Sequence, residues 1–170
     1  MEQDNKLGNV NHRPGLSKFA NSFLLFVITC GYIGYLPGAP GTYASILACI
    51  IVYFLTFSSV FWNMVFVCCL AVCSIVCINL MKYGDEDPYY IVIDELVGMF
   101  FTMAGHKPDF LNIIIGFILF RFFDIIKPYP IRRVEHLKGG YGVVADDVLS
   151  GIFANLLMCS GYMVFWNLWK

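Results

Sequence analysis

Charged side chains are scarce in this sequence. Asp, Glu, Lys and Arg make up only 14% of its 170 residues, whereas 59% of the residues are hydrophobic and the mean hydropathy is +0.71. A soluble domain usually contains about 25% charged residues. The composition therefore argues against a soluble globular protein and indicates an integral membrane protein.

The sequence also lacks the features of several other protein classes. Its net charge is −1 and it has no basic tract, so we expect no nucleic-acid partner. Its seven cysteines all lie in apolar segments, and none forms a CxxC pair with metal-ligand spacing. Residues 1–18 show neither the early apolar stretch nor the cleavage site of a signal peptide, so we interpret them as a polar N-terminal arm.

Long apolar segments fill the rest of the chain, at residues 19–36, 43–57, 60–80, 89–104, 110–126 and 143–168. Residues 60–80 are the clearest membrane span, because about 20 apolar residues cross a hydrocarbon core of about 30 Å. No strand-like alternation persists, so we predict an all-α, polytopic membrane helical bundle of about five to six helices, with residues 19–170 as one domain. Gly31 and Gly34 interrupt residues 19–36, which leaves two alternatives for that segment: re-entrant or interfacial, or a full span.

The loop at residues 127–142 sets an orientation for these segments. It carries Lys127, Arg132, Arg133 and Lys138, and basic loops stay on the cytoplasmic side of a membrane. Following the apolar segments in both directions from this loop brings every charge within them to the same cytoplasmic edge. We therefore expect a multi-pass protein whose functional site faces the cytoplasm.

Carboxylates dominate the charges at this edge. Asp94 and Glu95 are adjacent in the apolar run VIDELVGMFF, Asp124 lies near the end of residues 110–126, and Asp146 and Asp147 begin the last apolar segment. A carboxylate buried away from water costs several kcal/mol unless it is compensated. Convergent carboxylates suit a hard divalent cation, and Mg²⁺ is our prediction because it also bridges to phosphate. Asp87, in the preceding loop, is a further candidate for this cluster.

Three other residues are candidates for binding a phosphate, namely Thr42, Arg121 and Lys127. The arginine offers a planar fork to an anion, although it could instead form a local ion pair with Asp124, three residues away on the same helix face. Thr42 could equally be the N-cap of the helix at residues 43–57. Asp146 and Asp147 could likewise be dipole partners of the last helix, although that explains one aspartate better than two.

Four sequence blocks carry a family resemblance. They are PGT with Ser45, VIDELVG, FRFFDIIKPYPIR and GGYGVVADDVLSG, in this order over residues 40–151. Together they resemble phosphatidylglycerophosphatase A, the bacterial Mg²⁺-dependent lipid phosphatase that converts phosphatidylglycerophosphate to phosphatidylglycerol. The family often has glycine where this chain has Ala44.

The resemblance implies roles for the candidate residues and a place in the cell. Asp94, Glu95, Asp124, Asp146 and Asp147 would hold the metal and the chemistry, while Thr42, Arg121, Lys127 and Asp87 would support them. The substrate would be a phospholipid at the cytoplasmic face of the bacterial inner membrane, processed during phosphatidylglycerol biosynthesis. The oligomeric state stays open.

Two alternatives belong to other functional classes. A CDP-alcohol phosphatidyltransferase also clusters aspartates around Mg²⁺, but its DxxDGxxARx8GxxxDxxxD signature is not found here. An ion or proton transporter also uses intramembrane carboxylates, but it should place them near the middle of the membrane. Our prediction is therefore a phosphatase, with a water molecule attacking in line on a metal-held phosphate.

Overall fold

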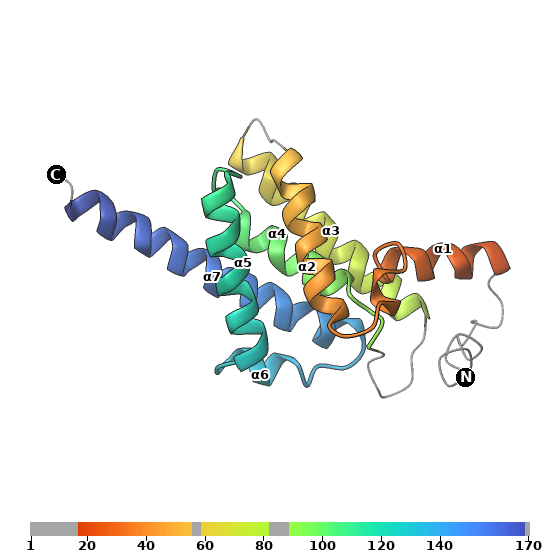
Figure 1. The fold of residues 1–170 in the computed structure, drawn as a ribbon. Coiled ribbons are helices and arrows are strands. Elements are labelled where there is room, and N and C mark those ends of the chain that lie inside the picture. Colours follow the sequence, from red (N-terminus) through yellow and green to blue (C-terminus); the bar gives the residue numbers. More distant parts are fainter. Residues whose placement is uncertain (1–16, 56–58, 82–88, 169–170) are drawn as a thin grey trace.

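A computed structural model of the chain describes residues 17–55, 59–81 and 89–168 (Figure 1). Its elements are α1 (Lys18–Ile28), the 3₁₀ helix η2 (Ile33–Tyr35), α2 (Pro40–Phe54), α3 (Val60–Met81), α4 (Ile93–Met103), α5 (Phe110–Ile126), α6 (Ile131–Val134) and α7 (Gly140–Leu168). Within these ranges there is no strand, so the predicted all-α class is confirmed. The polar arm up to residue 16, and Asp87, lie outside the described residues.

Helix α4 forms the centre of the bundle and packs against α2, α3, α5 and α7 (Figure 1). Seven of its 11 residues are buried, which is why the sequence around Asp94 and Glu95 is apolar on every side. The core on one side of α4 contains Met99 and Phe100 together with Phe120 of α5. Asp94 and Glu95 thus lie on a helix whose residues are mostly buried.

Glycines allow α4 and α7 to cross at very short range. A Cβ atom added to Gly151 of α7 would collide with the carbonyl oxygen of Gly98 of α4. One added to Gly98 would lie 2.7 Å from the carbonyl oxygen of Asp147. Small residues let helix backbones approach closely in membrane proteins. This crossing brings the start of α4 beside Asp147.

Two helices are long and apolar enough to cross a membrane, α3 over its whole length and α7 over Gly140–Val164. Helix α3 also exposes large apolar side chains such as Trp62, Val72 and Val76, as expected of a surface in contact with lipid. Helix α1 has 11 residues, which at about 1.5 Å per residue gives about 16 Å, or half of a hydrocarbon core. It therefore cannot cross alone, and the re-entrant or interfacial alternative for residues 19–36 is favoured.

Three helices begin at residues other than those predicted. Helix α2 begins at Pro40 because proline suits the first helical position, so Thr42 lies inside the first turn and the N-cap interpretation is wrong. Helix α4 begins only at Ile93, because the preceding Val92 N–H donates to the carbonyl of Ile28 (3.0 Å). These two differences, like that of α7, arise at helix starts, where the boundaries are hardest to predict from a local sequence pattern.

Helix α7 begins at Gly140, whose N–H donates to Asn79 Oδ1 of α3 (2.9 Å). Asp146 and Asp147 consequently lie in its second turn. A helix dipole acts mainly on the first turn, so the dipole interpretation of this pair loses its basis. The glycines upstream pack against protein: Gly140 lies against the Ile75 carbonyl and Gly142 against that of Leu137.

Candidate active site

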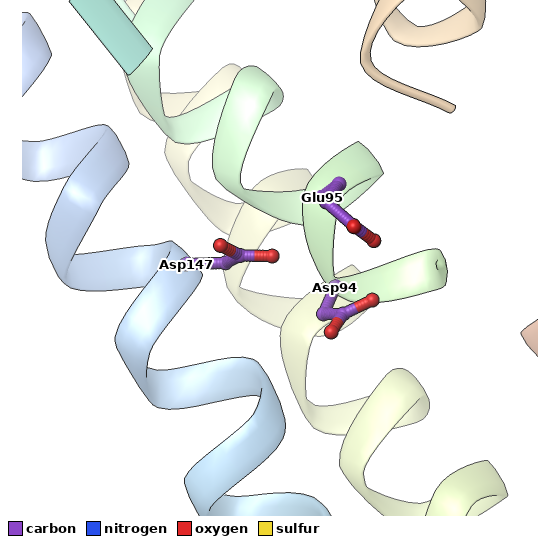
Figure 2. A group of neighbouring side chains, drawn as sticks. All are labelled: Asp94, Glu95 and Asp147. Carbon is purple, nitrogen blue, oxygen red and sulfur yellow. The ribbon is translucent and has the colours of Figure 1, made fainter. Parts of the chain in front are cut away.

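Three of the predicted carboxylates meet at the crossing of α4 and α7. Asp94 and Glu95 come from the first turn of α4, and Asp147 projects toward them from α7 (Figure 2). One oxygen from each of the three lies within 4.8 Å of the others. We refer to Asp94, Glu95 and Asp147 as the carboxylate cluster. It arises because the two helices start at the same end of the bundle and cross at their glycines.

The carboxylate cluster contains buried oxygens without partners. Asp94 Oδ1 and Glu95 Oε2 are shielded from solvent and accept no hydrogen bond from the described residues. Asp147 is only 3% exposed. Converging carboxylates repel one another, and burial removes the water that would screen them. A divalent cation with oxygen ligands fits this donor set, since it would compensate the charges and use the free lone pairs.

Asp124 and Arg121 lie beside the carboxylate cluster, on α5. Their ion pair is 2.8 Å long between Nη1 and Oδ2, and both side chains are largely buried. Asp124 also interacts electrostatically with Glu95 and Asp147, so it faces the same region. Although Nη1 lies at ion-pair distance, it is not aligned for a hydrogen bond. The predicted ion pair between Arg121 and Asp124 is therefore present, yet Arg121 Nη1 still has a hydrogen-bond donor available beside the carboxylates.

Asp146, by contrast, is held by Lys127. Lys127 is the C-cap of α5 and adopts a left-handed conformation (φ 45°), which ends the helix directly before Pro128. Its Nζ donates to Asp146 Oδ2 (2.6 Å) and to Glu135 Oε1 (2.8 Å). Burial lowers the pKa of Lys127, but the hydrogen bonds to these two carboxylates raise it by more, so the pKa lies above its usual value. The ammonium group is accordingly charged at neutral pH.

The first turn of α2 covers Glu95. A Cβ atom added to Gly41 would collide with Glu95 Oε1, so any larger residue here would force the Glu95 carboxylate to move. Thr42 follows directly in the same turn, and the buried Ser45 hydroxyl donates to the Gly41 carbonyl (2.9 Å). The PGT block is thus adjacent to the carboxylate cluster. The role of Gly41 against Glu95 was missed by sequence reasoning, although a Pro-Gly pair at a helix start was its signal.

Glu135 was missed as well. It lies eight residues after Lys127, in a segment whose charges read as a basic loop, and no local pattern pairs the two. Of the predicted site residues that the structure describes, Asp94, Glu95 and Asp147 meet directly. Asp124, Arg121 and Thr42 border them, and Asp146 with Lys127 forms a neighbouring ion pair.

The fold and the site define a helical membrane protein whose clustered carboxylates and flanking cations suit metal-assisted phosphoryl chemistry. The chain belongs to the phosphatidylglycerophosphatase A family, whose model matches residues 26–161. The resemblance of the four sequence blocks is thereby confirmed, and the protein is a phosphatase. Neither the phosphatidyltransferase nor the transporter alternative is favoured.

Curated relatives cover most of the chain. A putative phosphatidylinositol-3-phosphatase of Bacteroides thetaiotaomicron is 38% identical over 148 residues, which is 81% of this chain and 92% of that protein. Phosphatidylglycerophosphatase A of Haemophilus influenzae is 37% identical over 130 residues, 74% of this chain and 80% of the relative. The Escherichia coli protein of the same name is 34% identical over 143 residues, 81% of each chain. No solved structure matches the chain.

Proposed function

We propose that this protein hydrolyses the phosphomonoester of phosphatidylglycerophosphate in a Mg²⁺-dependent reaction, giving phosphatidylglycerol and phosphate. The family match and two relatives with this name support the substrate. The observation that carries the metal dependence is the carboxylate cluster, with the unpartnered buried oxygens of Asp94 and Glu95.

Asp94, Glu95 and Asp147 would hold the metal, with Asp124 beside them. A divalent cation there would supply Lewis-acid stabilisation of the phosphoryl oxygens. Each carboxylate has two oxygens, so Glu95 can contribute one to the carboxylate cluster and accept a hydrogen bond from the attacking water with the other. Glu95 is thus the residue that we assign to orienting that water.

Arg121 and Lys127 supply positive charge at this end of the bundle. Arg121 attracts Glu95 and is paired with Asp124, and its Nη1 has a free donor. Such a fixed cation stabilises charge that develops on phosphoryl oxygens in the transition state. Lys127 remains charged through its two carboxylate partners. Thr42, in the turn next to Glu95, is the neutral candidate for a hydrogen bond to the phosphate.

The site is proposed to face the cytoplasm from the bacterial inner membrane. The first turns of α4 and α7 and the last turn of α5 share the end of the bundle at which the basic segment 127–138 lies (Figure 1). Loops rich in Lys and Arg stay cytoplasmic. A phospholipid headgroup reaches this level without leaving the membrane surface.

Phosphatidylinositol 3-phosphate is the second candidate substrate, because the relative from Bacteroides thetaiotaomicron carries a name with that activity. It too presents a phosphomonoester on a lipid headgroup. The carboxylate cluster itself does not distinguish these two lipids, so both belong in the assay.

Phosphate release from each lipid by purified protein in detergent, with Mg²⁺ and with EDTA, tests the proposal. We expect release from phosphatidylglycerophosphate that EDTA abolishes and added Mg²⁺ restores. Faster release from phosphatidylinositol 3-phosphate would replace the proposed substrate. Release that is indifferent to EDTA would refute the metal dependence, and no release from either lipid would refute the function.

A further inference from the structure

A second feature at the same end of the bundle is a basic cavity of about 620 Å³. It lies where α5 passes into α6 and is lined by Lys127, Pro128, Tyr129, Arg132, Arg133 and His136. None of these residues is acidic. Arg132 and Arg133 are exposed, and among the described residues no carboxylate pairs with either of them. The cavity therefore offers unpaired positive charge.

Lys127 connects this cavity to the carboxylate cluster. It lines the cavity, and its Nζ contacts Asp146, the residue before Asp147. Tyr129 and Arg133 form another part of the lining, since Arg133 Nη1 lies 3.4 Å from the Tyr129 hydroxyl. An anion in the cavity would thus lie next to the site of phosphate cleavage, separated from it by one ion pair.

The cavity also lies beside apolar surface. Phe122, Ile125 and Ile126, in the last turns of α5, are each more than half exposed. Exposed apolar side chains next to unpaired arginines are typical of the level at which acyl chains give way to headgroups. The ligand that matches is a phosphate oxygen group attached to lipid, because arginine binds such groups through paired hydrogen bonds.

We propose that this cavity binds the phosphodiester of the substrate lipid while its phosphomonoester lies at the carboxylate cluster. The assignment rests on the proposed function. Phosphatidylglycerophosphate carries both groups, one at each end of the outer glycerol. The cavity would thereby select lipids with two phosphates and disfavour phosphatidic acid, which has the monoester alone.

The test compares Arg132→Ala/Arg133→Ala with Lys138→Ala, which removes a charge from the same segment outside the cavity lining. Three quantities are measured in uncharged detergent: the KM for phosphatidylglycerophosphate, and the inhibition constants of phosphatidylglycerol and phosphatidic acid. In the double variant we expect the KM for phosphatidylglycerophosphate and the inhibition constant of phosphatidylglycerol to rise about tenfold, because charge-assisted hydrogen bonds are lost. The kcat and the inhibition constant of phosphatidic acid should stay as in the wild type, and Lys138→Ala should change none of these values.

An unchanged KM in the double variant would overturn the assignment. An equally large rise in the inhibition constant of phosphatidic acid would overturn it too. The same KM is also measured in vesicles rich in anionic lipid. An effect of the double variant that appears only in these vesicles would overturn the assignment, because the cavity would then hold a neighbouring lipid. Restoration of the KM by Arg132→Lys/Arg133→Lys would support a role of charge. A wild-type protein that releases no phosphate would instead refute the proposed function, so the two failures are distinguishable.

Discussion

The two ends of the bundle treat buried polar groups in opposite ways. At the end remote from the carboxylate cluster, Asn155 Nδ2 donates to the carbonyls of Phe101, Thr102 and Ala104, at 3.2, 2.9 and 2.8 Å. Asp109 caps α5 by accepting from the Asn112 N–H (2.9 Å). At the other end, Asp94 Oδ1 and Glu95 Oε2 have no partner.

The same helices, α4, α5 and α7, contribute residues to both ends, so the contrast does not arise from a difference between helices. A polar group that stabilises a fold has its hydrogen bonds satisfied inside the fold. One that is buried and unsatisfied costs stability and persists where a ligand completes it. The hydrogen bonds of the first end therefore hold the helices together, whereas the unpartnered oxygens of the second end support our proposal that a ligand binds there.

The strongest test of this contrast is Asp94→Asn. The substitution keeps the shape but removes a negative charge from the carboxylate cluster, so we expect phosphate release to fall about 1,000-fold. The thermal unfolding temperature without metal should stay the same or rise, since repulsion with Glu95 and Asp147 is reduced. Added Mg²⁺ should raise that temperature in the wild type only.

Asp109→Asn is the matched control at the other end. Asn caps a helix as well as Asp, but it lacks the second carboxylate oxygen, which accepts from Asn112 Nδ2 (2.9 Å), so the unfolding temperature should fall slightly while the activity remains near wild type. Full activity in Asp94→Asn would show that Asp94 is not part of the site. An equal loss of activity in Asp94→Asn and Asp109→Asn would contradict the distinction between the two ends.

A smaller loss is expected from Gly151→Ala, which disturbs the helix crossing without touching a carboxylate. The added methyl group would collide with the Gly98 carbonyl, so α4 and α7 must separate. Displacement of Asp147 from Asp94 should reduce kcat about 10- to 100-fold, and overpacking should cost about 1–3 kcal/mol of stability.

Gly161→Ala lies on the same helix and has nothing within 4 Å of the added atom. It should leave activity unchanged and alter stability by at most about 1 kcal/mol. Wild-type kinetics in Gly151→Ala would show that the close crossing does not set the geometry of the carboxylate cluster.

The smallest effect on catalysis is expected from Asn155→Ala. Two carbonyls of α4 and that of its C-cap, Ala104, lose their donor, which should lower the free energy of unfolding by about 1–2 kcal/mol. The kcat of the folded protein should not change, because the carboxylate cluster lies at the other end of α4. Chemical denaturation in detergent and the phosphatase assay measure the two quantities, and a drop in kcat at full folding would contradict the division of roles.

Much of the site could be predicted because its signals are local. Asp94, Glu95 and Asp147 stand out as charges in apolar runs, and the basic segment after α5 fixes their common end. The pairing of Lys127 with Glu135 and the contact of Gly41 with Glu95 could not be read in the same way, because both depend on how separate elements pack.

The sequence by itself determined that this is a helical membrane phosphatase and which side chains carry its charge. Hydropathy and motif order are properties of the chain, and they survive any arrangement of the helices. Only the tertiary structure decided which carboxylates share a site. Asp146 and Asp147 are neighbours in sequence, yet one is held by Lys127 and the other faces Asp94 and Glu95. Successive residues on a helix point about 100° apart, so the crossing of α4 and α7 selects between them.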